Sequence, residues 1–148
     1  MRAPCRDFDT SVRTVGGMRA VTRGLLLFAH GARDPRWALP FEDVAARVRL
    51  AHPGVPVALA FLEFMAPDLR AAGTQLAAQG CTRVDVLPLF LGAGGHVRKD
   101  LPELLAELSA AHAGVRWQLH PAIGELDPVI AAMANAAGQL LAASTDTK

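Results

Sequence analysis

The sequence predicts an α/β domain with an open, mainly parallel four-stranded sheet and helices on both faces. Two observations lead to this fold class. Short apolar runs alternate with longer helical segments along residues 24–143, as in strand–helix–strand units. The runs are apolar almost throughout, which is typical of strands buried on both faces. At 148 residues, the chain can form one domain that buries about two-thirds of its unfolded surface.

The first two helices connect the first three of four predicted strands, which are residues 24–29, 57–62, 84–91 and 115–119. The first helix should run from Leu39 or Pro40 to Ala51, because proline favours the first turn. The second should follow Pro67 and stop at Gly80, since glycine suits the position just past a helix. The residues expected on the buried face of the first helix are Val44, Val48 and Ala51.

The last two helices are predicted from their capping residues. Asp100 would be the N-cap of the third helix, because Glu103 follows three residues later as in a capping box. This helix should end by Gly114. The fourth should begin with Asp127 as N-cap and Pro128 in its first turn, and continue through an Ala-rich stretch to about residue 143.

The composition of the chain bears on its domain organisation and on the classes of function that it can have. Residues 1–22 are expected to be a mobile extension before a single domain at 23–143, with a frayed tail at 144–148. The formal net charge of +1 gives no general reason to bind nucleic acid or an anionic membrane. Cys5 and Cys81 form no metal-ribbon or disulfide pattern, so a reducing cytoplasm is the expected compartment.

Three possible metal ligands recur at intervals of 33 residues: His30, Glu63 and His96. This interval is close to the length of one strand-plus-helix unit, and each residue lies at or after the end of a predicted strand. Open α/β sheets bind ligands beyond the carboxyl ends of their strands. Two imidazoles and a carboxylate there predict a site for a borderline divalent metal.

Each candidate also has a structural alternative. His30 alone could be a satisfied structural histidine, and Glu63 could cap the helix that follows it. His96 follows a loop whose Gly94 and Gly95 permit close backbone approach to a ligand, yet the loop lacks the complete dinucleotide and phosphate-loop motifs. His120 follows the fourth strand, where a structural or rim position is favoured over ligation.

Basic residues cluster around the same predicted edge. As solvated surface residues they need no special explanation, but beside a metal site they would attract a polycarboxylate, because arginine can bind carboxylates with two hydrogen bonds. The residues concerned are Arg33, Arg36, Arg98 and Lys99.

The sequence resembles the small class II tetrapyrrole chelatases, the sirohydrochlorin cobaltochelatases and ferrochelatases. Three segments carry the resemblance, which extends from about residue 24 to 142: His30-Gly31-x-Arg33-Asp34-Pro35, Ala60-Phe61-Leu62-Glu63, and Pro88-Leu89-Phe90-Leu91 with Gly94-Gly95-His96-Val97-Arg98-Lys99-Asp100-Leu101-Pro102. One departure is Ala32, where the family usually has serine. That change removes a hydroxyl but no metal ligand.

The resemblance implies insertion of Co²⁺ or Fe²⁺ into sirohydrochlorin for cobalamin or sirohaem synthesis, with cobalt favoured. A relative inserts nickel. The divalent metal would be a substrate, no organic cofactor would be needed, and the single-length chain would form a homodimer. The family's metal-handling residues correspond to His30, Glu63 and His96, while Arg33, Gly94, Gly95, Arg98 and Lys99 are expected to contact the substrate.

Two other functions are compatible with parts of this pattern. A non-catalytic metal or tetrapyrrole carrier would use the same ligands without turnover. A histidine phosphatase also has a strand that ends in His-Gly, but here Ala29 precedes His30. The arginine that would grip phosphate in that class is therefore missing.

Overall fold

The computed structural model describes residues 20–92 and 94–143, without the side chain of His96. Most of the expected extension and the expected frayed tail lie outside this part of the chain. Its elements, in chain order, are β1 (Arg23–Ala29), η1 (Pro35–Ala38), α1 (Leu39–Ala51), β2 (Val57–Phe61), α2 (Leu69–Ala78), β3 (Arg83–Pro88), α3 (Gly95–Ala111), β4 (Arg116–Leu119), η2 (Ile123–Glu125) and α4 (Asp127–Ala143). Here η marks a 3-10 helix.

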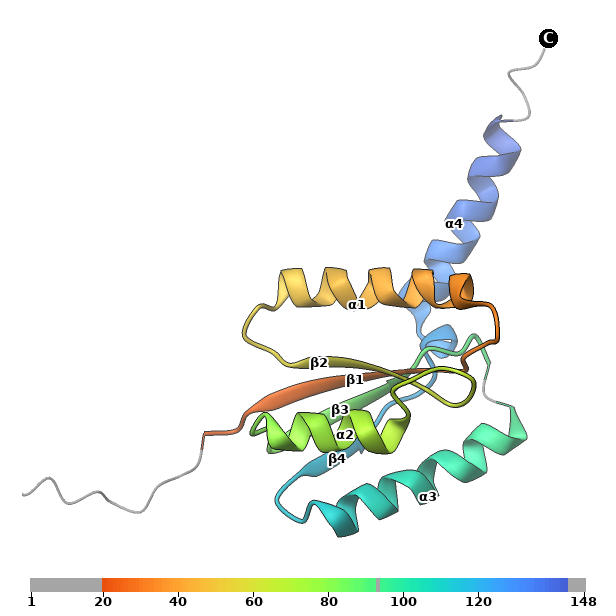
Figure 1. Cartoon of the computed structure of the whole chain (residues 1–148). Coiled ribbons are helices and arrows are strands. Elements are labelled where there is room, and N and C mark those ends of the chain that lie inside the picture. The colour runs from red at the N-terminus through yellow and green to blue at the C-terminus, as the bar shows by residue number, and fades with distance from the viewer. Residues whose placement is uncertain (1–19, 93, 144–148) are drawn as a thin grey trace, which may run out of the picture.

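The four strands form one parallel sheet in the order β2-β1-β3-β4. Leu26 of β1 aligns with Ala58 on one side and Val86 on the other. Helix α1 covers one face, and α2 and α3 cover the opposite face, whereas α4 projects away from the sheet (Figure 1). The predicted fold class is confirmed.

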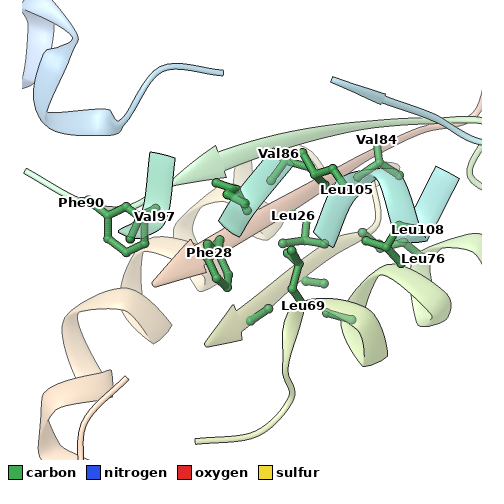
Figure 2. Packing of buried hydrophobic residues seen from close by; sticks show 14 of the residues in the cluster. Leu26, Phe28, Leu69, Leu76, Val84, Val86, Phe90, Val97, Leu105 and Leu108 are labelled. Atoms are coloured by element: carbon green, nitrogen blue, oxygen red, sulfur yellow. The ribbon is translucent and has the colours of Figure 1, made fainter. Parts of the chain in front are cut away.

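Strand side chains alternate between two apolar layers. On the α2–α3 side, the centre of the core contains Leu26, Phe28, Val84 and Val86, as Figure 2 shows together with residues from both helices. On the α1 side, Leu27 belongs to a second cluster with residues of η1, α1 and the strand ends. Burial on both faces explains why the strand sequences read as continuous apolar runs.

The expected position of Gly80 is confirmed, and two histidines occupy C-cap positions. Gly80 lies just past α2 with a positive φ of 87°, a conformation that glycine adopts without steric cost. His52 and His112 are the C-cap residues of α1 and α3, and both have a φ of −130°. The backbone N–H of each donates to the carbonyl four residues earlier.

The predicted start of the third helix is wrong. Helix α3 begins at Gly95 with Gly94 as N-cap, so Asp100 lies inside it. Val97 and Leu101 are buried four residues apart, and their packing holds the first turn in place despite the weak helix propensity of glycine. As a consequence, the helix N-terminus reaches the carboxyl edge of the sheet.

Other differences are smaller. Strand β3 ends at Pro88 instead of residue 91, and η1 was not predicted. The buried face of α1 is also different, since Ala45 is its buried residue while Val44 and Ala51 are exposed. Among the described residues, the structure contains no helix with the length and apolar character needed to cross a bilayer.

Candidate metal and tetrapyrrole site

The loops that follow β1 and β2 lie side by side at the carboxyl edge. Hydrogen bonds continue past the strands, because the N–H of Leu62 donates to the Ala29 carbonyl at 2.9 Å and that of Glu63 to the His30 carbonyl at 3.0 Å. The side chains of His30 and Glu63 are both exposed. This backbone contact agrees with the predicted proximity of the first two residues of the trio.

Gly31 makes this close approach possible. Its φ is +88°, and a Cβ atom at this position would overlap the carbonyl oxygen of Glu63. A glycine is therefore needed for both the backbone conformation and the space. The next residues form η1, where Asp34 is the N-cap and accepts a hydrogen bond from the Arg36 N–H at 2.9 Å.

The corresponding level of β3 holds an aromatic ring instead of a metal ligand. Phe28 aligns with Pro88, so continuing the register by two residues pairs His30 with Phe90. Their rings are in contact, with centroids 4.6 Å apart and planes inclined by 53°. The same continuation on the other side pairs His30 with Leu62, so the equal sequence spacing places Glu63 one residue beyond the level of His30, whereas His96 lies six residues beyond it.

His96 reaches this edge by a different route, as the second residue of α3. Phe90 and Val97 belong to the same buried cluster (Figure 2). The ring of Phe90 thus contacts His30 on one side and belongs to the cluster that fixes the first turn of α3. The His96 side chain lies outside the described residues. Among the side chains that are described, no three of His, Cys, Asp or Glu converge on a point.

The basic residues at this edge have different surroundings. The guanidinium of Arg33 lies over the ring of Phe64, 4.9 Å from its centroid. Arg98 is 3.7 Å from the carboxylate of Glu125, and Lys99 is exposed beside it on α3. Arg36 is held by Asp34 at 2.7 Å, and its side-chain hydrogen bonds lower the pKa of Asp34.

The N-terminus of α3 brings backbone donors to the same region. Gly94 is the N-cap and Gly95 the first helical residue, and neither has another atom within 4 Å of where a Cβ would lie. The first N–H groups of a helix lack intrahelical partners and favour negative charge. A carboxylate of a bound substrate could approach the backbone of this turn closely.

An apolar cavity of about 320 Å³ lies next to this turn. Phe90, Val97 and Leu101 supply apolar parts of its wall, and the ion pair of Arg98 and Glu125 borders it. Phe90 lines this cavity and also contacts His30, so the cavity and the candidate ligand share one wall residue. It can hold an apolar part of a substrate beside charged groups.

His120 is held by a buried carboxylate below this edge. Its Nε2 lies 2.8 Å from Oδ1 of Asp85, while the Nε–H of Arg23 donates to Oδ2 at 2.7 Å. Burial raises the pKa of Asp85, but the hydrogen bonds from His120 and Arg23 and the charges of Arg23 and Arg83 outweigh it, and the pKa falls to about 2. His120 therefore has a structural partner.

Sequence reasoning did not single out Phe64 or Phe90. Phe64 is 58% exposed and has a φ of 63°, which is uncommon for a residue with a bulky side chain. Both phenylalanines follow strand ends next to candidate ligands. For Phe64, an aromatic residue directly after the predicted strand 57–62 is the sequence signal that could have identified it, whereas Phe90 falls within the predicted strand 84–91 and has no separate signal.

Solved structures of other proteins share this fold. A CbiX protein from Marinobacter aquaeolei, described as putative in cobalamin biosynthesis, is 33% identical, with a TM-score of 0.72 over 80% of this chain and 97% of that chain. The sirohydrochlorin chelatase SirB from Bacillus subtilis subspecies spizizenii, solved with cobalt, is 25% identical with a TM-score of 0.66. The match covers 80% of this chain and 51% of SirB.

Curated relatives give the same family. Sirohydrochlorin cobaltochelatases from Methanococcoides burtonii and Saccharolobus solfataricus are 30% and 37% identical over 82 and 84 residues. Each match covers 55% of this chain and spans 63% or 62% of the relative's length. The CbiX family model matches residues 24–140, which include the sheet, the three carboxyl-edge loops and most of α4. The chain therefore belongs to the CbiX family.

Proposed function

We propose that this protein is a sirohydrochlorin chelatase that inserts Co²⁺, or alternatively Fe²⁺, into the tetrapyrrole. The observation that carries the proposal is the pairing of the His30 and Glu63 backbones at the carboxyl edge, within a chain of the CbiX family. Cobalt is favoured because the curated relatives are named cobaltochelatases. Iron remains the alternative substrate, since SirB from Bacillus subtilis has been solved with Fe³⁺.

Metal insertion sets three chemical requirements. The ion must lose water ligands, the macrocycle must turn its nitrogens toward the ion, and two pyrrole N–H protons must leave as the metal–nitrogen bonds form. Neutral imidazoles can bind the ion or accept protons near neutral pH. We assign these roles to His30 and His96, and to Glu63 a negative charge that favours the incoming cation.

The surroundings of His30 fit this role. Its ring is held against Phe90 and remains exposed, so it is oriented by packing while solvent and substrate can reach it. Catalytic metal sites keep an open coordination position, and here that position would be taken by the macrocycle nitrogens. Arg33, Arg98 and Lys99, with the backbone at Gly94 and Gly95, would receive the peripheral carboxylates.

An anaerobic insertion assay tests the chemistry. His30→Ala and His96→Ala should each reduce the insertion rate by at least about 100-fold, the lower range for loss of a positioned acid–base group, without loss of the folded state. Glu63→Gln should lower the rate while preserving shape. The matched control is His112→Gln, because His112 lies at the far end of α3 and contacts Thr74.

The same assay separates an enzyme from a carrier. An enzyme should metallate sirohydrochlorin repeatedly, with initial rates for Co²⁺ and Fe²⁺ that rank the two metals. Binding of both ligands without metallation would instead favour the carrier. A His30→Ala, His96→Ala double variant that inserted metal like the parent would show that the ligand assignment is wrong.

We also propose that the active form is a homodimer whose two carboxyl edges face each other. One edge can cover only one side of a macrocycle, and a symmetric pair would supply the other. The comparison with SirB supports the dimer. This chain matches only 51% of a SirB chain, so one copy accounts for about half of that protein. Light scattering that showed only monomers in a fully active sample would contradict the dimer.

The proposed compartment is the cytoplasm. A reducing environment maintains iron as Fe²⁺ and keeps the buried, free thiol of Cys81 reduced. Cell fractionation with an antibody against the chain should find it with cytoplasmic markers. Recovery with an extracytoplasmic fraction would contradict this assignment.

A further inference from the structure

The loop between β2 and α2 extends beyond the carboxyl edge of the sheet (Figure 1). The Phe61 N–H donates to the Pro67 carbonyl at 2.9 Å, which closes the loop at its base. The N–H groups of Leu62 and Glu63 join the loop to the segment that follows β1. Backbone hydrogen bonds therefore fix the position of Phe64, which lies between these contacts.

Phe64 occupies a strained turn in this loop. The Met65 N–H donates to the Glu63 carbonyl at 2.8 Å, so Phe64 is the central residue of a three-residue γ-turn. Its φ is 63°, and this hand of the turn is rare because it costs free energy in any residue that has a Cβ atom. Strain of this kind is typical of ligand-binding sites. A phenylalanine here, where glycine would fit without cost, therefore points to a role for the ring.

The turn gives two neighbouring apolar side chains different surroundings. Met65 packs against the buried cluster on the α1 side of the sheet, whereas Phe64 is 58% exposed. The Phe64 ring contacts the guanidinium of Arg33, and Phe64 directly follows Glu63 in the chain. The ring thus lies next to a proposed metal-handling carboxylate and a proposed substrate-binding cation, and most of it is open to a ligand.

The exposed apolar side chains of this edge have cations as neighbours. Leu91, which directly follows Phe90, is 69% exposed, and Arg33 and Arg98 have exposed guanidinium groups at the same edge. A flat conjugated macrocycle with peripheral carboxylates has an apolar face and a charged rim. Apolar side chains beside cations match both parts of such a molecule, whereas a small anion would need only the cations.

We propose that the ring of Phe64 packs against the face of the sirohydrochlorin macrocycle and sets its position relative to His30 and Glu63. This inference rests on the proposed function and adds a residue that contacts the substrate. Aromatic rings attract one another in offset or edge-to-face arrangements, and a conjugated tetrapyrrole allows both. Arg33, held against the same ring, binds a carboxylate at the rim of the macrocycle. The strained turn keeps the Phe64 ring at the edge and out of the core.

Equilibrium dialysis with metal-free sirohydrochlorin, under anaerobic conditions, tests this contact without requiring insertion. Phe64→Gly should raise the dissociation constant about tenfold, the upper range for loss of an aromatic pair, whereas Phe64→Tyr keeps the ring and should bind like the parent. Urea unfolding should show that Phe64→Gly is at least as stable as the parent, since glycine adopts a positive φ without steric cost. Leu50→Ala is the matched control, because it removes another exposed apolar side chain, near the end of α1, and should leave binding unchanged.

Two further measurements separate the ring from the arginine that it supports. The effect of Arg33→Ala on binding should shrink as ionic strength rises, because exposed charges are screened, whereas the effect of Phe64→Gly should persist. Phe64→Gly should also weaken binding in an Arg33→Ala background. No further weakening in that background would show that Phe64 acts only by holding Arg33, and this would overturn the proposal.

The outcomes distinguish this inference from the proposed function. If the parent binds and metallates sirohydrochlorin and Phe64→Gly binds it equally well, the inference is wrong and the function stands. Ring-dependent binding without metallation would support the contact and contradict the chelatase, while a parent that binds no sirohydrochlorin would remove both. If Phe64→Gly weakens binding only because the protein has become monomeric in light scattering, the ring belongs to a contact between copies, and the inference is again overturned.

Discussion

At the scale of single residues, Gly31 determines how closely the loops after β1 and β2 can approach. The His30 carbonyl accepts from the Glu63 N–H, while the space beside Gly31 is filled by the Glu63 carbonyl. The relative positions of two proposed metal-handling residues therefore depend on a residue that carries no side chain. The proposed metal chemistry of His30 and Glu63 therefore depends on the backbone conformation of Gly31.

Gly31→Ala should consequently impair both stability and activity. A non-glycine residue in the left-handed region costs about 1–2 kcal/mol, and the overlap with the Glu63 carbonyl must add to this cost. Urea unfolding should show the loss of free energy, and the insertion assay should show a reduced rate. Gly54→Ala is the control, because nothing lies within 4 Å of its Cβ position. Equal behaviour of the two variants would contradict the assigned role of Gly31.

Arg33 is proposed to bind a peripheral carboxylate of the substrate without entering the chemistry. Its guanidinium packs over Phe64, and a peripheral carboxylate changes little between the ground state and the transition state. Arg33→Ala should therefore raise KM about tenfold, which corresponds to ~1.4 kcal/mol, and change kcat less. Arg36→Ala, which alters a guanidinium already engaged by Asp34, should have a smaller effect. A fall in kcat at constant KM would instead place Arg33 in the chemistry.

At the scale of elements, strand pairing creates the Asp85 network. Asp85 lies in β3 and Arg23 in β1, and His120 directly follows β4. The apolar runs predicted the strands, but they did not predict which strands are neighbours. The order β2-β1-β3-β4 is what brings these three polar residues together, so the network could not be read from local sequence.

Asp85 should make stability depend on pH at the acid end. Its pKa is about 2 in the folded protein against 3.8 for a free side chain. The stabilisation is therefore complete above about pH 3.8 and is lost as the pH falls through about 2, and it is on the order of 2 kcal/mol. Asp85→Asn should be less stable than the parent at pH 7, and the difference should shrink between pH 4 and pH 2 in urea unfolding. Asp34→Asn, in an exposed ion pair, is the control with little effect. A difference that stayed constant over this range would contradict the assignment.

The helices show where local sequence rules succeed and where packing overrides them. Pro40 and Gly80 correctly indicated the start of α1 and the end of α2. Asp100 and Glu103 resembled a capping box, yet the burial of Val97 in the core extends α3 back to Gly95. The contact of His30 with Phe90 also depends on tertiary register. The sequence could indicate that His30 lies at the carboxyl edge of the sheet, but it could not indicate that Phe90 lies beside it.

At the scale of the whole molecule, the protein is asymmetric in how its surfaces are covered. The α2–α3 side of the sheet is closed by two helices, whereas the α1 side is covered by one, and α4 projects beyond it (Figure 1). The carboxyl edge and a cavity beside α1 both adjoin the segment from His120 to Leu126. The segment from His120 to Leu126 therefore connects the cavity beside α1 with the edge where insertion is proposed to occur.

If two carboxyl edges form one site, insertion activity per chain must depend on protein concentration. Diluting the enzyme below the dissociation constant of the dimer should lower its specific activity, because a single edge cannot enclose the macrocycle. Saturating sirohydrochlorin should shift the transition to lower protein concentration, since a ligand that binds the dimer stabilises it by mass action. Initial rates and sedimentation velocity, measured over the same dilution series, should show coincident transitions. Constant specific activity in samples that sediment as monomers would show instead that one chain contains the complete site.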